Sequence, residues 1–104
     1  MNTIPKDLDL SLIVGEFTTQ IGVGQFDIQF TFGNLHFAVT SQVNLFREGT
    51  VIGHWEEGKW PDPGFYDIMN TEITRCRAVD DNRIVIEFAN GIEMQLEEIG
   101  RAHV

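Results

Sequence analysis

Hydrophobic and polar residues alternate with a period of two in two parts of the chain, which is the pattern of β-strands with one buried face. In the first part the alternation runs on either side of Gly33-Asn34, two residue types that tolerate the positive φ of a hairpin turn. In the second part it runs on either side of Asn90-Gly91, the strongest two-residue hairpin signal. Each part therefore predicts an antiparallel hairpin. The four alternating runs cover residues 26–32, 35–39, 84–88 and 92–96.

A further strand-like run, rich in Thr and β-branched residues, precedes each hairpin, over residues 16–23 and 72–79. The two parts are related by an offset of 56 residues, and the second copy has one extra residue at its hairpin tip. We predict a mainly β fold in which two antiparallel three-stranded meanders form a small sandwich or a partial barrel. The identical pairs are Glu16 and Glu72, Thr18 and Thr74, Val23 and Val79, Ile28 and Ile84, Phe32 and Phe88, and Asn34 and Asn90.

The segment between the copies has a different character. We expect Val43, Leu45 and Phe46 to extend the third strand, and residues 50–55 to form a short strand after a turn. A loop with two prolines follows, and residues 65–70 predict at most one short helix. Residues before Leu10 are expected to be a loose lead, with an edge strand through Leu8, Leu10 and Leu12 as the alternative.

The 104 residues are enough for one domain, which we place at residues 1–98. The last six residues, 99–104, read IGRAHV and break the preceding pattern. This hexapeptide resembles one reading frame of a common short-read sequencing adaptor. We interpret it as a non-native tail, and the natural domain as truncated near Glu97.

Sixteen Asp and Glu residues against seven Lys and Arg residues give a formal net charge of −9 at pH 7. Nucleic acid and anionic membranes are excluded as partners, because binding them needs clustered cations. The acidity suits a basic protein partner, or serves only to keep the protein in solution. The lone Cys76, with no signal-peptide pattern at the N-terminus, predicts a cytoplasmic protein. The oligomeric state stays open.

No cluster of residues predicts catalysis, a metal or a cofactor, so we do not expect an enzyme. His54 has carboxylates beside it, but three or four ligands converging on one point are not apparent. His36 is expected on the outer face of its strand, with pairing to Glu93 as one option, and it lacks a partner for general-base work. Cys76 lies between Arg75 and Arg77, whose charges could lower a thiol pKa, but a small structural residue is the preferred interpretation.

The most informative segment is the aromatic, acidic stretch between the two copies. Its aromatic residues either close one end of the sheet pair as core or form a surface that recognises a partner or ligand, since Trp and Tyr dominate interface hot spots. Nearby carboxylates would suit such a surface to a basic partner. The candidate surface consists of Trp55, Glu56, Glu57, Trp60, Asp62, Phe65 and Tyr66.

The C-terminal stretch IEFANGIEMQLE, residues 86–97, resembles a family of small bacterial proteins of unknown function that are similar to immunity proteins of polymorphic-toxin and contact-dependent-inhibition loci. The resemblance is best over residues 70–97 and thinner over residues 16–41. It implies a small protein-binding domain that neutralises a toxin, and it brings no catalytic residues. The alternatives are a β domain that binds a small molecule in the aromatic segment and a structural domain of another role.

Overall fold

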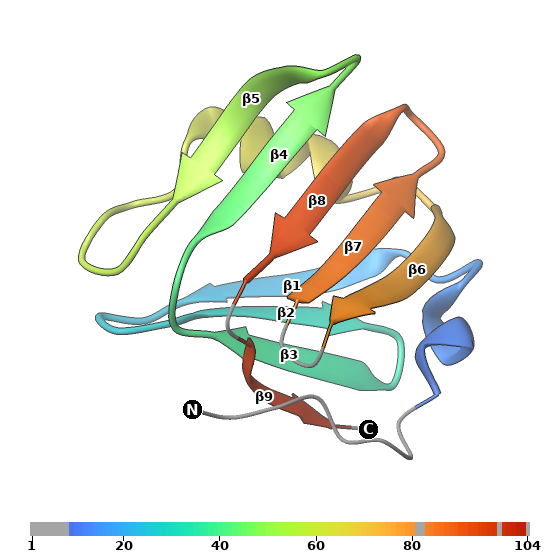
Figure 1. Ribbon diagram of the computed structural model, residues 1–104, viewed down its shortest axis with the longest axis horizontal. Helices are drawn as coiled ribbons and strands as arrows, with labels where there is room; N and C mark the ends of the chain where they lie inside the picture. The colour runs from blue at the N-terminus through green and yellow to red at the C-terminus, as the bar shows by residue number, and fades with distance from the viewer. Residues whose placement is uncertain (1–8, 81–82, 98, 104) are drawn as a thin grey trace.

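Two antiparallel sheets pack face to face in the computed structural model, and the strands of one sheet run obliquely across those of the other (Figure 1). The structure describes residues 9–80 and 83–97, and the backbone of residues 99–103. The predicted mainly β fold is confirmed, and of its two predicted forms the structure shows the sandwich and not the partial barrel. The first sheet has the order β1-β2-β3-β9 and contains β1 (Thr18–Val23), β2 (Ile28–Phe32), β3 (Leu35–Val39) and β9 (Ile99–His103). The second has the order β5-β4-β8-β7-β6 and contains β4 (Val43–Arg47), β5 (Thr50–Trp55), β6 (Ile73–Asp80), β7 (Arg83–Phe88) and β8 (Ile92–Leu96).

The alternating residues of the two predicted hairpins form the core between the sheets. Phe30 on β2 lies opposite Phe37 on β3, and Ile86 on β7 lies opposite Met94 on β8. All four side chains are fully buried. Each large apolar side chain removed from water contributes about 1.5–3 kcal/mol, so the sequence pattern itself supplies the force that joins the sheets.

The repeat is visible in the sheet registers. Phe30 pairs with Phe37, and Ile86 pairs with Met94. The second strand of each copy, β2 or β7, therefore corresponds at an offset of 56 residues, from Phe30 to Ile86, and the third strand, β3 or β8, at an offset of 57, from Phe37 to Met94. The extra residue in the second hairpin turn, predicted from the sequence, explains this change.

The first strand of each copy corresponds at a different offset. A β-bulge lies at Thr19 in β1 and at Thr74 in β6, an offset of 55. Each bulge threonine donates its hydroxyl hydrogen to a carbonyl of the neighbouring strand, at 3.1 Å to Thr31 and 3.2 Å to Glu87. The structural equivalent of Thr74 is therefore Thr19, and the match of Thr18 with Thr74 was wrong by one residue.

The expectation that Val43, Leu45 and Phe46 extend the third strand was wrong. The chain turns at residues 40–42, and Val43–Arg47 becomes β4, which lies between β5 and β8 in the opposite sheet. Val43 and Leu45 are fully buried there. Alternation predicts a buried face but not the sheet to which that face belongs, so the second sheet has five strands instead of three.

Two short 3-10 helices are present in the described ranges, where at most one was predicted. The expected helix near residues 65–70 is η2 (Pro63–Ile68), which begins earlier because proline fits the first helical turn. The other is η1 (Leu10–Ile13), where an edge strand through Leu10 and Leu12 was the alternative; Leu8 and the rest of the expected loose lead, residues 1–8, lie outside the described residues. The Asp9 carboxylate accepts hydrogen bonds from the Ser11 amide at 3.0 Å and hydroxyl at 2.6 Å, which favours a turn over an extended strand.

Neither helix, nor any other helical segment of the described residues, has the length and apolar character needed to cross a bilayer. The backbone of Ile99–His103 forms β9 beside β3. Backbone hydrogen bonds of this kind can form with almost any sequence, so the presence of β9 does not test whether residues 99–104 are native. Their interpretation as a non-native tail stays a prediction.

Candidate recognition groove

The helix η2 closes the gap between the edges of the two sheets. The Phe65 ring stacks on Phe30 of the first sheet, with centroids 6.4 Å apart. Gly64 lies so close to Ile52 of the second sheet that an added Cβ would meet the Ile52 carbonyl oxygen at 2.4 Å. The Asn90 side chain, from the second hairpin turn, donates a hydrogen bond of 2.9 Å to the carbonyl of Asp67. Contacts from three directions therefore fix the helix.

A groove with a volume of about 380 Å³ runs between η2 and the edge strand β1. Most of its lining is apolar, and two of its aromatic side chains, Trp60 and Tyr66, are each 75% exposed. Such exposure is unusual for large aromatic residues, which normally bury most of their surface. The lining residues are Ile21, Val23, Trp60, Pro61, Asp62, Phe65, Tyr66 and Met69.

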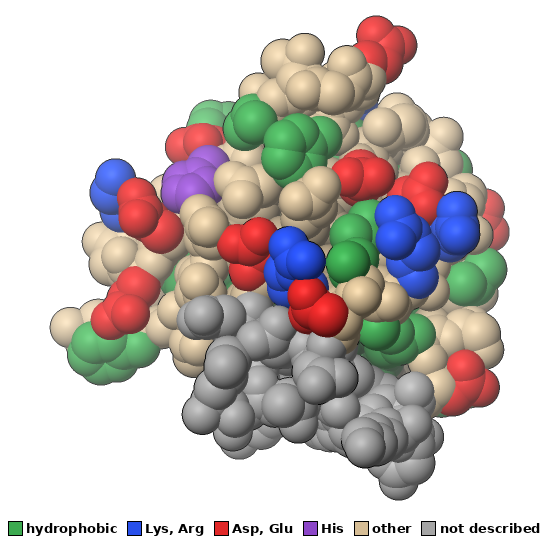
Figure 2. All heavy atoms as spheres, in the orientation of Figure 1, with side chains coloured by type: hydrophobic (Ala, Val, Ile, Leu, Met, Phe, Trp, Pro, Cys, Tyr) green, Lys and Arg blue, Asp and Glu red, His purple; other side chains and the backbone are tan. Residues whose placement is uncertain are grey.

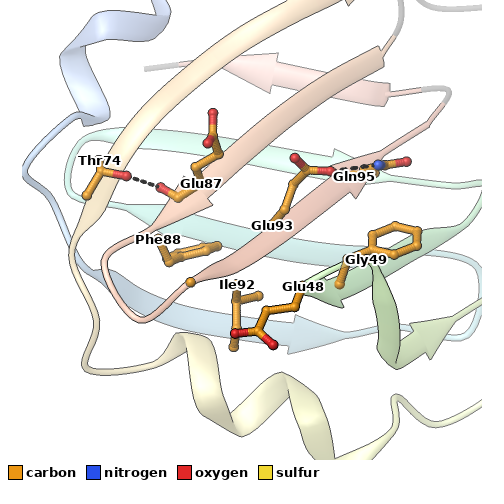
Figure 3. Close-up of a pocket in the computed structure, with 10 residues that line it drawn as sticks. Glu48, Gly49, Thr74, Glu87, Phe88, Ile92, Glu93 and Gln95 are labelled. Atoms are coloured by element: carbon orange, nitrogen blue, oxygen red, sulfur yellow. Dashed lines mark hydrogen bonds between the residues drawn. The ribbon is translucent and has the colours of Figure 1, made fainter.

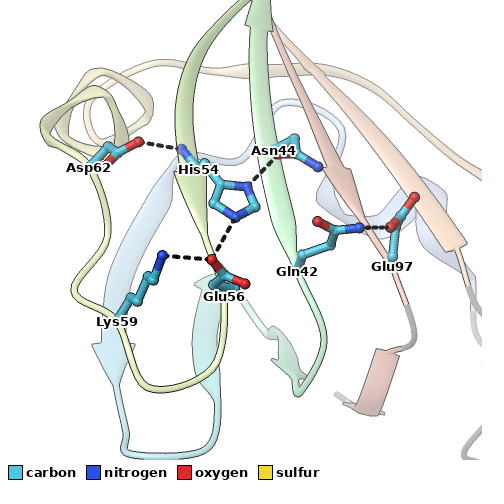
Figure 4. A network of polar contacts seen from close by, with 7 residues as sticks. All are labelled: Gln42, Asn44, His54, Glu56, Lys59, Asp62 and Glu97. Carbon is cyan, nitrogen blue, oxygen red and sulfur yellow. Dashed lines mark hydrogen bonds and ion pairs between the residues drawn. The ribbon is translucent and has the colours of Figure 1, made fainter.

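The loop that carries Trp60 is tied to β5 through both backbone groups of His54. The Asp62 carboxylate accepts a hydrogen bond from the His54 amide at 3.0 Å, and the Asp62 amide donates to the His54 carbonyl at 3.3 Å (Figure 4). Asp62 thereby satisfies backbone groups of β5 that have no neighbouring strand to pair with. This carboxylate holds the groove loop in place as well as lining the groove.

The imidazole of His54 extends the same network. Its Nδ1 donates to Oδ1 of Asn44 at 2.7 Å, since an amide oxygen only accepts, and its Nε2 lies 3.7 Å from Glu56 (Figure 4). Lys59 hydrogen-bonds to Glu56 at 2.9 Å, which lowers the pKa of the Glu56 carboxyl and raises the pKa of Lys59. His54 thus links β4, β5 and the following turn in a structural network.

The sequence-predicted surface is divided by the structure. Trp60, Asp62, Phe65 and Tyr66 come together in the groove. Trp55 does not, because its side chain is fully buried in the core, where its indole N–H has no hydrogen-bond partner among the described residues.

Core and surface, the two alternatives for the aromatic segment, therefore each apply to part of it. Phe65 belongs to both, since it is only 3% exposed and forms the floor of the groove. Glu56 and Glu57 are exposed on the adjoining turn and do not line the groove.

Sequence analysis missed the opposite wall of the groove. Ile21 and Val23 were assigned to a strand, and their inner-face position gave no sign that η2 would pack beside them. Met69 was expected in the helical segment but not in a binding surface. Only the docking of η2 against two sheets brings these side chains together.

Charge is distributed unevenly over the surface. Three of the five described Lys and Arg side chains, Arg75, Arg77 and Arg83, belong to β6 and β7, where blue side chains gather in Figure 2. The segment from residue 56 to 67 carries four carboxylates and one cation, Lys59, which is paired with Glu56. The neighbourhood of the groove is therefore acidic.

A second hollow, of about 480 Å³, lies on the outer face of the five-stranded sheet (Figure 3). Glu48, Glu87 and Glu93 are among its lining residues, and Gln95 donates a hydrogen bond of 2.8 Å to Glu93. Arg75 lies 3.7 Å from Glu87. In the part of the chain that the structure describes, no group of three or more His, Cys, Asp and Glu side chains is placed to hold a metal ion.

The remaining candidates have structural environments. Burial raises the pKa of the Cys76 thiol to about 12, the opposite of activation by its arginine neighbours. His36 lies with its Nδ1 3.0 Å from the Thr31 hydroxyl on the adjacent strand. Glu93 is on β8 of the other sheet, so the option that His36 pairs with Glu93 does not hold.

Comparisons of the chain with protein families, with curated proteins and with solved structures find no match. The function of the groove therefore has to be inferred from its geometry and chemistry.

Proposed function

We propose that this protein is an acidic recognition domain that binds a basic protein through the groove between η2 and β1. The observation that carries the proposal is the pair of aromatic side chains, Trp60 and Tyr66, that stay 75% exposed beside an apolar groove. Exposed Trp and Tyr residues next to an apolar depression are typical of interaction hot spots. The fixed loop and helix favour binding, because little conformational freedom remains to be lost.

The sign of the partner's charge follows from the groove surroundings. Glu57, Asp62 and Asp67 are exposed carboxylates on the loop and helix that form one wall. The cations of β6 and β7 lie toward the edge of the second sheet opposite to β5, the strand against which η2 packs. A basic partner would be attracted and an acidic one repelled, most strongly at low salt.

A selection from a random decapeptide library displayed on phage tests the proposal. We expect enriched peptides to carry an excess of Lys and Arg, and to bind about tenfold or more weakly when salt rises from about 0.05 M to about 0.5 M. The double variant Trp60→Ala, Tyr66→Ala should lose most of the binding. Phe17→Ala, which truncates another exposed aromatic residue outside the groove, is the matched control. Enrichment of acidic peptides, or equal binding by the two variants, would contradict the proposal.

The more specific proposal is that the partner is a toxin domain and that the protein neutralises it. Support comes from the resemblance of residues 86–97 to proteins similar to immunity proteins, together with the acidic groove. A gene for a basic toxin domain should then lie immediately beside the gene for this chain. We expect the purified toxin domain to raise the melting temperature at micromolar concentration, and absence of binding at that concentration would exclude the immunity role.

A small apolar ligand is the second candidate, because a volume of about 380 Å³ falls within the usual range for ligand pockets. A fragment library screened by thermal shift distinguishes the two functions. Fragments that compete with the selected peptides for the wild-type groove would show that small molecules can use the same site, whereas fragment binding without any peptide enrichment would favour the ligand-binding alternative.

A further inference from the structure

The edge of β1 presents unpaired backbone groups toward the groove. In an antiparallel pair, the N–H and C=O of alternate residues point to opposite sides of the strand. The Gly24 amide donates to the Asp27 carbonyl at 2.8 Å across the first turn, so Gly24 and, two residues earlier, Gly22 point toward β2. The N–H and C=O groups of Ile21 and Val23 therefore point away from β2. Among the described residues, no strand pairs with β1 on that side.

Both edges of the second sheet are protected against pairing with another chain, in contrast to the β1 edge of the first sheet. At β5, Asp62 takes up the backbone groups of His54, and η2 packs against Ile52. At β6, the exposed cations Arg75 and Arg77 lie within the strand, and η1 packs against it. Charged residues and covering elements are the usual devices that keep an edge from pairing with another chain.

The β1 segment, TTQIGV, has neither a charge nor a proline. Its residues 21–23 are half-buried beside the groove, and no described backbone or side-chain group hydrogen-bonds to the outward amides of Ile21 and Val23. This edge therefore keeps its capacity to pair with an incoming strand.

Side-chain directions link the open edge to the groove. Ile21 lies opposite Phe30 and Val23 lies opposite Ile28, and both partners are fully buried, so Ile21 and Val23 face the inner side of the sheet. Residues of an added strand that pair with Ile21 and Val23 would project their side chains to the same side, toward Tyr66 and the rest of the groove. The alternate residues would project to the outer face, beside Gly22.

Charge selects the occupant of this edge. A second copy of the chain would bring its own net charge of −9 and its own acidic groove surroundings, so pairing of β1 with β1 would be opposed by repulsion. A basic segment would be attracted by the exposed carboxylates Glu57, Asp62 and Asp67 on the loop and helix beside the groove.

We propose that the domain binds its basic partner by strand addition: an extended segment of the partner hydrogen-bonds to the backbone of Ile21 and Val23 on β1, with alternate apolar side chains in the groove and Lys or Arg side chains near its acidic surroundings. The inference rests on the proposed function and states how that partner is held. Backbone pairing supplies affinity, and the groove supplies specificity.

The test uses the full chain, labelled with ¹⁵N, and a synthetic version of the most enriched decapeptide from the selection. Amide hydrogen exchange should slow about tenfold or more for Ile21 and Val23 when the peptide saturates the protein, while exchange at Gly22, whose amide points to β2, changes little. Phe17 serves as a control position outside the groove.

A series of peptides, each methylated at one backbone nitrogen, provides an independent readout with no change to the protein. Strand addition predicts that methylation weakens binding about tenfold at every second position and has little effect at the positions between, because only alternate amides face β1. Binding by side chains alone predicts no such alternation.

The outcomes separate the two proposals. Alternating losses together with protected Ile21 and Val23 amides support strand addition. Salt-dependent peptide binding with unprotected amides and no alternation overturns strand addition and leaves the proposed function standing. If no basic peptide is enriched, the proposed function fails and this inference with it. Protection of the same two amides that rises with protein concentration alone would overturn the choice of partner, because a second copy would then occupy the edge.

Discussion

The close approach of η2 to β5 makes Gly64 the position where the smallest side chain should matter most. A methyl group at Gly64 would lie 2.4 Å from the carbonyl oxygen of Ile52 and 3.1 Å from its carbonyl carbon. Both atoms belong to the backbone of a paired strand, so unlike side-chain atoms they cannot move aside by a change of rotamer. An ordinary C···O contact needs about 3.3 Å or more, and η2 would have to move outward by about 1 Å.

The cost of Gly64→Ala follows from this movement. Overpacking of this kind typically costs about 1–3 kcal/mol, and the reduced freedom of the unfolded chain offsets about 0.4–1 kcal/mol of it. We expect a net loss of about 1–2 kcal/mol, which lowers the melting temperature by about 4–8 °C per kcal/mol in a domain of this size. Phe65 is the next residue after Gly64, and its ring stacks on Phe30. Displacement of this ring adds to the loss of stability.

Gly22→Ala is the matched control. An added Cβ at Gly22 meets its nearest neighbour, the Gln29 Cβ, at 3.7 Å, which is ordinary contact. Urea unfolding of the two variants should show a lower midpoint for Gly64→Ala and an unchanged or slightly higher one for Gly22→Ala. Equal midpoints would refute the claim that η2 is held against the β5 backbone. The same displacement should weaken peptide binding in the folded Gly64→Ala variant, because η2 forms one wall of the groove.

Three further predictions concern single side chains. Asp62→Ala should lower the free energy of unfolding in urea by about 0.5–1.5 kcal/mol, and Asp62→Asn by less, because asparagine keeps an acceptor for the His54 amide; equal losses would show that charge matters more than this bond. Trp55→Ala should cost about 3–5 kcal/mol, whereas Trp55→Phe should cost much less than its lost volume implies, because removal of the unpaired indole N–H relieves about 1–3 kcal/mol; a large loss in Trp55→Phe would reveal a partner for that N–H. For Cys76, a pKa raised from 9.0 to about 12 means that the folded protein keeps the thiol proton over a pH range in which the unfolded chain releases it. The resulting stability is fully present below pH 9.0 and is lost as pH rises toward 12. Between pH ~7 and pH ~10.5 the free energy of unfolding of the wild type should therefore fall by about 2 kcal/mol more than that of Cys76→Ala. If the unfolding free energies of the two proteins changed in parallel with pH, the burial of the thiol would be contradicted.

The local elements of this fold follow from the sequence because their causes are local. Alternation across Gly33-Asn34 and Asn90-Gly91 specifies two hairpins, since the turn residues fix the register and a slip of one residue would expose the whole apolar face. The same reasoning identified the aromatic segment as the place to search for a binding surface, and four of its seven named residues line the groove.

Tertiary structure decided everything that depends on which surfaces meet. The alternation of Val43 and Leu45 fits either sheet equally well, and only the crossing at residues 40–42 assigns them to the second sheet. Trp55 and Trp60 are the same residue type in the same segment, yet one is fully buried and the other 75% exposed. The strand β5 places Trp55 in the core, while Trp60 lies on the loop between β5 and η2, with its side chain exposed beside the groove.

The edge strand β1 shows this division most clearly. The sequence by itself predicted a strand over residues 16–23, which the structure has as β1 from residue 18 to 23, and it determined that the protein is strongly acidic, because periodicity and charge are properties of the chain. It did not determine that β1 would be an edge, or that η2 would leave a groove beside Ile21 and Val23. Those features arise from long-range packing, in which a helix is fixed by contacts with both sheets and a strand's backbone groups stay unpaired only because of where its neighbours end.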